Sequence, residues 1–323
     1  MLMTIPNRWI RTLTNALAVA ACAALIAENA HAQLVPGTGR KVLEVGDDLE
    51  DPDWSYTFNL PKSSTNLDRQ TRWPTGTSSN ERWFESAYRG QPDVIKRVPT
   101  PPKGIPGSRG ALLLQSRATG IPGSLTHKMQ QDDFMLNISG RIGHVPVSWQ
   151  PSCVVRVYLP PFDEWENRTG SHFGMRADVV GESWQKPKRG LFGGFRRQKT
   201  KIEPYWPGFF IQFNSKDDPQ HDTDSAVLII RSDESGHDFM GPQISEPGWW
   251  TLGMSFTRDG RVHYYAKPGV SKLRAQDHIA SMMPYSSTAK QFHTFYFNVV
   301  NFDNGKSWST KWIIDDPTLY YVR

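Results

Sequence analysis

Polar and aromatic side chains alternate with apolar ones along four short segments of this sequence. Because successive side chains of a β-strand point to opposite faces, such alternation predicts one face turned to a core and one polar face. The polar positions of the four segments are the candidate ligand-binding residues: Arg156, Tyr158, His172, Arg176, Gln212, Asn214, Tyr296 and Asn298. If the strands share a sheet, these side chains form a single polar and aromatic face.

A face of this composition is suited to carbohydrate. Aromatic rings pack under sugar rings, and amides or guanidinium groups bond to hydroxyls and carboxylates. The alternative is that one face of an antiparallel sheet is simply solvated. The pattern therefore nominates these residues for binding polysaccharide without deciding between the two interpretations.

The same face holds the ingredients of a β-eliminating polysaccharide lyase. Arg156 or Arg176 would neutralise a uronate carboxylate, and His172 or Tyr158 would take the proton from C5. The catalytic candidates are therefore His172, Tyr158 and Arg176. For His172 an ordinary surface histidine is the competing interpretation, and no motif fixes the geometry of these side chains.

Two acidic pairs are candidate ligands for a structural calcium ion, which prefers six to eight oxygen ligands. Asp47 and Asp48 precede the first predicted strand, and Asp315 and Asp316 lie in the last. If the terminal strands are neighbours, the two pairs can share one ion. A second acidic group, at 217–224, lacks the spacing of an EF-hand loop. No motif requires any other cofactor.

The segments that must position these residues form a succession of predicted β-strands. Period-two alternation and intervening turn residues predict about eleven strands. They are 54–60, 111–116, 134–138, 153–159, 172–180, 209–214, 226–231, 249–257, 261–266, 292–301 and 311–322. A helix is predicted only around Glu81–Tyr88. The fold class is therefore all-β, with two antiparallel sheets face to face.

Two pieces of the sequence resemble a known superfamily. The predicted hairpin of Gly248–Leu252 and Asp259–Ala266 turns at Arg258-Asp259-Gly260, where glycine can take a positive φ. It resembles a hairpin common in concanavalin A-like and laminin-G-like jelly rolls. The closing segment Trp312–Tyr320 is similar to their last strand, which returns beside the first. The resemblance implies a jelly-roll sandwich, in a superfamily that includes lectins, glycosidases, polysaccharide lyases and adhesion modules.

Acidic residues do not form the pattern of a retaining glucanase of that superfamily. Such an enzyme typically carries E-x-D-x-x-E along one strand, and this sequence has no such string. The nearest cluster, Asp163-Glu164-Trp165-Glu166, follows Pro160-Pro161, which ends a strand, so we expect a solvated loop there. Paired carboxylates from separate strands stay open as an alternative.

Positive charge is concentrated in one segment. The chain has 37 Lys and Arg against 32 Asp and Glu, and Lys186–Lys201 (KPKRGLFGGFRRQKTK) contributes seven positive charges and no acid. This concentration argues against a nucleic-acid-binding protein. The segment is predicted to be a Gly-rich loop, either contacting something anionic or a protein partner or merely solvated. The segment 61–110 is predicted to be a second long insertion, largely irregular.

The first 32 residues have the composition of a signal peptide. Basic residues precede an apolar run from Ala16 to Ala27, which is shorter than the roughly 20 residues of a membrane span. The run is followed by Ala30-His31-Ala32, which fits signal peptidase and predicts a mature chain from Gln33. A competing interpretation takes Cys22 as the lipidated first residue of a lipoprotein. With the leader removed, Cys153 alone remains and no internal disulfide can form.

These observations predict an exported protein with one domain at 33–323. The leading hypothesis is a polysaccharide-binding jelly roll of the cell envelope or extracellular space. The first alternative is a lyase or glycosidase of the same fold that acts on acidic glycan. The second is a structural or adhesion domain with a protein partner. The predicted partner is thus a polysaccharide or an anionic envelope component.

Overall fold

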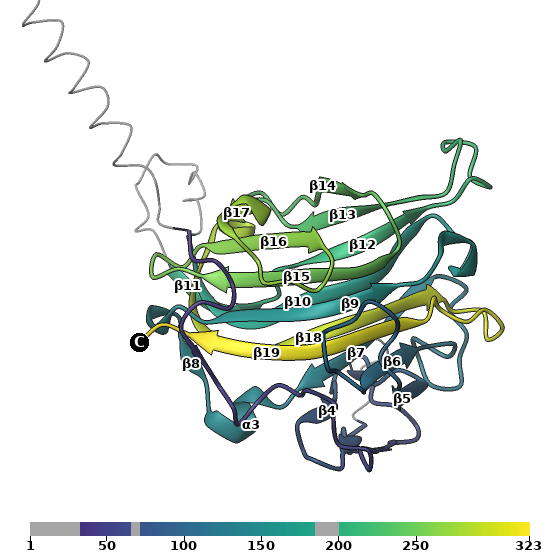
Figure 1. The fold of residues 1–323 in the computed structure, drawn as a ribbon, viewed down its shortest axis with the longest axis horizontal. Coiled ribbons are helices and arrows are strands. Elements are labelled where there is room, and N and C mark those ends of the chain that lie inside the picture. Colours follow the sequence, from purple (N-terminus) through teal and green to yellow (C-terminus); the bar gives the residue numbers. More distant parts are fainter. Residues whose placement is uncertain (1–32, 66–71, 185–199) are drawn as a thin grey trace, which may run out of the picture. The chain divides into compact units, whose positions relative to one another are not determined.

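Two antiparallel sheets lie face to face in the computed structural model, which describes residues 33–65, 72–184 and 200–323 (Figure 1). The arrangement is the all-β jelly-roll sandwich that the sequence predicts. The predicted signal peptide at 1–32 and positions 186–199 of the basic loop lie outside the described residues. In the ranges described, no helix is long and apolar enough to cross a membrane.

The smaller sheet contains eight of the described strands, in the order β17-β16-β15-β9-β19-β6-β5 with β1 beside β19. Their bounds are β1 Arg40–Lys41, β5 Val94–Val98, β6 Ala111–Gln115, β9 Ser152–Leu159, β15 Gly248–Phe256, β16 Val262–Pro268, β17 His278–Met282 and β19 Trp312–Tyr321. Arg40 pairs with Tyr321. The last strand therefore returns beside β1, a short strand that was not predicted, whereas the first predicted strand, 54–60, enters the larger sheet.

The larger sheet contains eleven described strands, in the order β14-β13-β12-β10-β18-β7-β4-β3-β2, with β11 beside β10 and β8 beside β18. Their bounds are β2 Tyr56–Thr57, β3 Thr77–Ser78, β4 Trp83–Glu85, β7 Met129–Leu136, β8 Val145–Pro146, β10 Gly170–Trp184, β11 Thr200–Tyr205, β12 Gly208–Asn214, β13 Ser225–Arg231, β14 Phe239–Ile244 and β18 Ser287–Phe302. A short helix, α3 (Ile138–Ile142), follows β7, and single 3₁₀ turns lie at Val147–Trp149, Phe162–Glu164, Ala275–Asp277 and Pro284–Ser286.

The predicted helix at Glu81–Tyr88 is wrong, because its centre is strand β4. Trp83 pairs with Leu136 on β7, and its ring stacks on Phe134 with centroids 4.6 Å apart. The insertion at 61–110 is accordingly less irregular than predicted, since β3, β4 and β5 all lie within it. A tertiary partner overrides local propensity in this segment.

The predicted hairpin near the carboxyl end is confirmed. Strands β15 and β16 pair from Trp250 opposite Pro268 to Phe256 opposite Val262. Gly260 in the turn has a φ of 81°. A Cβ at that position would lie 2.7 Å from the backbone nitrogen of Ala289, so the turn requires glycine both for its conformation and for its space.

The core between the sheets is formed by alternating strand positions. The apolar positions predicted to face inward all belong to it: Val155, Val157, Leu159, Phe173, Met175, Ala177, Val179, Phe209, Ile211, Phe213, Phe295, Phe297 and Val299. Because side chains alternate across a strand, the intervening residues of β10, β12 and β18 must face away from the core. These residues form the outer face of the larger sheet.

A buried ion-pair network fastens the segment after β2 to the sandwich. The Lys62 ammonium lies 2.8 Å from Asp132 Oδ2 and 2.9 Å from Asp93 Oδ1. The Ser116 hydroxyl donates to the same Asp132 oxygen at 2.6 Å. Asp132 is fully buried on β7, so burial opposes its ionisation while Lys62 favours it.

We expect the free energy of unfolding to fall as the pH rises from about 5 to about 8. Burial raises the pKa of Asp132 to about 7, whereas an unfolded aspartate has a pKa of about 3.9. The stabilising contribution of the protonated carboxyl is therefore lost as the pH rises through the folded-state pKa. Asp132→Asn removes this titration, so urea denaturation of the variant should show a smaller fall than the parent.

Asp163→Asn is the control for this measurement, because the Asp163 side chain is exposed on the turn after β9. This variant should keep the full pH dependence of the parent. Burial also raises the pKa of Asp133, so part of the fall persists in Asp132→Asn. An identical pH dependence in Asp132→Asn and the parent would contradict the assignment to Asp132.

Candidate functional site

The outer face of the larger sheet brings together five of the predicted ligand-binding residues. On β10, Arg176 pairs with Tyr296 of β18 and with Gly208 of β12. Directly paired residues of antiparallel strands share a face, so Arg176 and Tyr296 lie side by side. The five residues on this face are Arg176, Gln212, Asn214, Tyr296 and Asn298.

Arg156 and Tyr158 do not join this face, because β9 belongs to the smaller sheet. Arg156 Nη1 lies 2.9 Å from Asp316 Oδ2, and its Nε donates to the carbonyl of Val270. Tyr158 pairs with Trp249. The structure thus corrects the expectation of one shared face, since alternation within a strand carries no information on which sheet the strand enters.

His172 also lies away from this face, because a β-bulge interrupts β10 between Ser171 and Phe173. The imidazole is fully buried, with Nδ1 3.1 Å from Thr310 Oγ1 and Nε2 2.8 Å from the carbonyl of Arg168. Burial lowers the pKa of His172 to about 3. A neutral imidazole with both nitrogens already bonded has a structural role, and an extra residue in a strand reverses the facing that alternation predicts.

Arg176 is the centre of the outer face. Its Nε and Nη2 donate to the carbonyl of Trp206, at 3.1 and 2.7 Å. The guanidinium carbon lies 5.8 Å from the ring centroid of Phe210 and 5.9 Å from that of Tyr296. Within the described ranges, no carboxylate forms an ion pair with it. The group is half-buried and fixed by a carbonyl, and it keeps N–H donors for an anion.

A second arginine, Arg231 of β13, lies on the same face of the sheet as Arg176. It pairs with Gly208, which separates it from Arg176. A Cβ on Gly208 would lie 2.6 Å from Arg176 Cγ, so the absent side chain leaves room between the two arginines. The Arg231 guanidinium carbon also lies 5.8 Å from the Phe210 ring centroid. Two guanidinium groups therefore share one aromatic ring. The charge of Arg231 is partly balanced by Asp238, whose Oδ1 lies 3.8 Å from Arg231 Nε.

A titratable cluster that was not among the predicted site residues lies beside Arg176. His293 Nδ1 lies 3.8 Å from Asp178 Oδ2, and the ring of His144 stacks on that of His293 with centroids 3.8 Å apart. Asp178 also accepts a hydrogen bond from the side chain of Trp206, which is 38% exposed. Burial raises the pKa of Asp178 and lowers that of His293. His293 occupies a second β-bulge, opposite the step from Asp178 to Val179, and so alternation could not nominate it.

The remaining polar residues of the face bond to one another. Gln212 Nε2 donates to Asn214 Oδ1 at 3.0 Å, and Asn298 Nδ2 donates to Asp133 Oδ1 at 2.6 Å. Asn298 Oδ1 has no hydrogen-bond partner in the described part of the chain. It lies over Gly174, where a Cβ would be 2.6 Å away. Asn298 is fully buried, so only the amides of the half-buried Gln212 and Asn214 reach the surface of this face.

Comparison with known proteins was informative only at the level of solved structures. No family model matches the sequence, and no curated protein does. An alginate lyase from Pseudomonas aeruginosa is 9% identical, covering 72% of this chain and 87% of its own, with a TM-score of 0.38. An endo-β-1,4-glucuronan lyase from Trichoderma reesei is 8% identical, covering 83% and 95%, with a TM-score of 0.35.

The globular domain of T. cruzi calreticulin is similar to the same degree, with 10% identity, coverage of 75% and 84%, and a TM-score of 0.36. The likeness is one of fold. At identities and scores this low, it carries no argument about activity. What this protein does must therefore be argued from its own residues.

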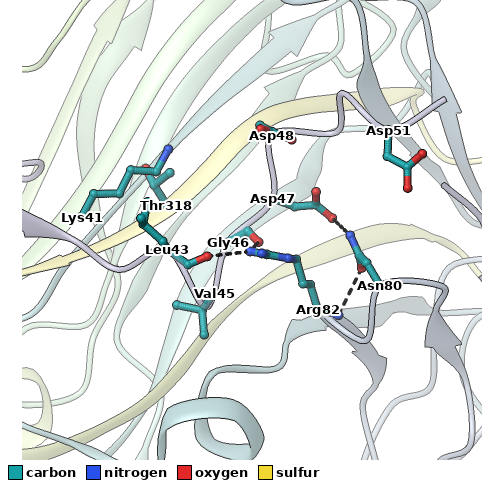
Figure 2. Close-up of a pocket in the computed structure, with 10 residues that line it drawn as sticks. All are labelled: Lys41, Leu43, Val45, Gly46, Asp47, Asp48, Asp51, Asn80, Arg82 and Thr318. Carbon is teal, nitrogen blue, oxygen red and sulfur yellow. Dashed lines mark hydrogen bonds between the residues drawn. The ribbon is translucent and has the colours of Figure 1, made fainter. Parts of the chain in front are cut away.

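The four aspartates predicted to bind calcium have protein partners. Asp47 accepts hydrogen bonds from Trp54 Nε1 at 3.0 Å, Trp83 Nε1 at 2.8 Å and Asn80 Nδ2 at 2.9 Å. Figure 2 shows its carboxylate turned toward Asn80, while Arg82 reaches the carbonyls of Leu43 and Gly46. Asp47 therefore acts as an anchor for the segment that leads into the sandwich.

The other three aspartates are also engaged. Asp48 accepts from the backbone nitrogen of Glu50, Asp315 from the hydroxyl of Ser108, and Asp316 pairs with both Arg156 and Lys41. In the part of the chain that the structure describes, no group of three or more His, Cys, Asp or Glu side chains could hold a metal ion. Asp48, Asp315 and Asp316 nevertheless line one pocket, and Asp315 Oδ1 has no hydrogen-bond partner in the described residues, so calcium at these aspartates stays a prediction.

Proposed function

We propose that this protein engages an acidic polysaccharide on the outer face of its larger sheet, with Arg176 bonding a uronate carboxylate. The observation that carries the proposal is a half-buried guanidinium that is held by a carbonyl and flanked by aromatic rings. No described carboxylate forms an ion pair with it, although the buried Asp133 lies near enough to interact with its charge. Such a pre-organised arginine bonds a planar carboxylate in bidentate geometry at low entropic cost.

Neighbouring side chains support a sugar ligand. Trp206 offers a partly exposed indole that bonds to Asp178, and an indole can pack against the apolar face of a pyranose. Gln212 and Asn214 are half-buried on the same face and offer amide groups to hydroxyls. Arg231, which is ion-paired with Asp238, lies one strand pair away as a second guanidinium. Positive charge, aromatic surface and amides thus occur together on this face, and a chain of uronate residues requires all three.

Cleavage by β-elimination is the second candidate function, and the Asp178–His293 pair favours it. Elimination needs a base for the C5 proton and a positive group on the carboxylate. Because burial lowers the pKa of His293, its imidazole is neutral and able to accept a proton near neutral pH. Asp178 would stabilise the imidazolium that results. Nδ1 faces this carboxylate, whereas Nε2 is buried and has no hydrogen-bond partner in the described ranges, which counts against direct transfer of a C5 proton to Nε2.

The first test is retention of the purified protein on immobilised acidic and neutral polysaccharides. We expect stronger retention on polyuronates than on neutral polymers, and the excess should fall as salt is added, because exposed charges are screened over about 8 Å at physiological ionic strength. New ultraviolet absorbance from unsaturated chain ends would identify the lyase. Equal retention on neutral polymers would contradict the proposal. Capture of an envelope protein without glycan binding would instead favour the adhesion alternative.

A further inference from the structure

A pocket of about 390 Å³ opens on the opposite side of the sandwich, against the smaller sheet. Its wall includes the paired residues Tyr158 of β9 and Trp249 of β15. Their rings meet edge to face with centroids 5.5 Å apart. Because their neighbours Val157 and Trp250 belong to the core, both rings lie on the outer face of the smaller sheet. We call this the Tyr158 pocket.

The Tyr158 pocket is rigid at its base. Trp249 is 5% exposed, and its Nε1 faces the carbonyls of Pro101 and Pro102 at 3.4 and 3.2 Å. Four proline rings line the walls: Pro102, Pro161, Pro247 and Pro268. Proline restricts its own backbone, so these walls are formed before a ligand arrives. The volume lies within the range of about 300–1,000 Å³ that is usual for small-ligand sites.

The pocket offers hydrogen-bonding capacity without net charge. Tyr158 is half-buried, and its hydroxyl has no hydrogen-bond partner in the described part of the chain. Lys103 and Glu246 are its charged lining residues, one of each sign. Gly248 and Gly269 have positive φ, and a Cβ on either would meet no atom within 4 Å, so the backbone at the rim is open. A uronate carboxylate would gain little here, in contrast to the face around Arg176.

We propose that the Tyr158 pocket binds a neutral pyranose sugar. The ring of Tyr158 packs against the apolar C–H face of the sugar, and its hydroxyl bonds a sugar hydroxyl. Lys103 and Glu246 give the lining no net charge, so the pocket has no excess positive charge to attract an anionic sugar. The site is independent of Arg176, which lies on the outer face of the other sheet. The protein then has two glycan sites of different specificity.

The test is a titration of the full chain with methyl glycosides of neutral sugars, followed by tryptophan fluorescence and ligand-observed NMR. A methyl glucuronide and a proline-rich peptide serve as competing probes. We expect a neutral glycoside to bind and Tyr158→Ala to weaken it by about tenfold or more, the effect of losing about 1.4 kcal/mol. Tyr158→Phe keeps the ring and should cause a smaller loss. Arg176→Gln should leave this binding unchanged.

Tyr88→Ala is the matched control, because Tyr88 is 58% exposed and does not line the pocket. Thermal melts of the variants, with Tyr158→Phe as the mildest change, separate misfolding from loss of the site. No binding by any neutral glycoside, unchanged binding in a folded Tyr158→Ala, or binding of the peptide or the glucuronide in place of neutral sugars would each overturn the proposal. Loss of neutral-sugar binding in Arg176→Gln would show that the two sites are one.

Discussion

Truncating Phe297 to alanine is expected to lower the free energy of unfolding by about 3–5 kcal/mol. The side chain is fully buried at the middle of β18. Its ring stacks on Phe173 with centroids 5.8 Å apart and also contacts Trp83 and Phe295, at 6.1 and 6.0 Å. The variant therefore loses the free energy gained by moving a ring out of water. It also loses the van der Waals contacts of the atoms that surround the resulting cavity. Equilibrium unfolding in urea measures the difference.

The control for Phe297→Ala is Tyr88→Ala, which removes a ring that is 58% exposed. Its cost should stay within about 0.5 kcal/mol, as for most surface substitutions. The residues on either side of Phe297, Tyr296 and Asn298, face the opposite side of the sheet. Equal costs for Phe297→Ala and Tyr88→Ala would therefore contradict both the register of β18 and the face on which the candidate site is built.

Much of this fold could be predicted from the sequence, because inner-face residues repeat every second position along long strands. The inward orientation of Phe173, Met175 and Phe297 can be predicted from the alternation within their own strands. Short strands could not be found in this way. Strands β3 and β4 are too brief to show a period, and β4 exists because Trp83 packs on Phe134 of a strand far along the chain.

The candidate site was predictable in part. Arg176 and Tyr296 lie at regular positions of β10 and β18, so alternation placed both on the outer face. His172 was assigned to the wrong side, and His293 was not nominated, because each lies at a β-bulge where the alternation fails. Bulges depend on pairing between strands, which a single sequence does not display.

For the aspartates near the terminal strands, the sequence did not predict their hydrogen-bond partners. β19 lies beside β1, a two-residue strand that alternation could not reveal, and not beside the predicted first strand 54–60. The partners of Asp47 were not predictable, because Trp54, Asn80 and Trp83 come from separate turns and strands. Clustered carboxylates in a sequence are compatible both with a cation site and with acceptors for buried N–H groups, and only the arrangement in space distinguishes the two.

Replacing Arg176 with glutamine is expected to weaken binding of an oligouronate by about 10- to 100-fold. Hydrogen bonds to charged groups contribute about 1.5–3 kcal/mol, and each 1.4 kcal/mol is about tenfold in affinity. Arg109→Gln makes the same change of charge at a side chain that is 80% exposed and lies apart from β10 and its neighbours. This control should bind nearly as well as the parent, because a distant exposed charge is screened. Isothermal titration of the three proteins measures the effect.

The most direct test of the central claim combines Arg176→Gln with a ligand whose carboxylates have been reduced to alcohols. Four affinities are measured: parent and variant, each with the oligouronate and with its reduced form. If Arg176 bonds a carboxylate, each change alone weakens binding, and the variant no longer distinguishes the two ligands, so the effects are strongly non-additive. Equal discrimination between the two ligands by the parent and by Arg176→Gln would contradict the account.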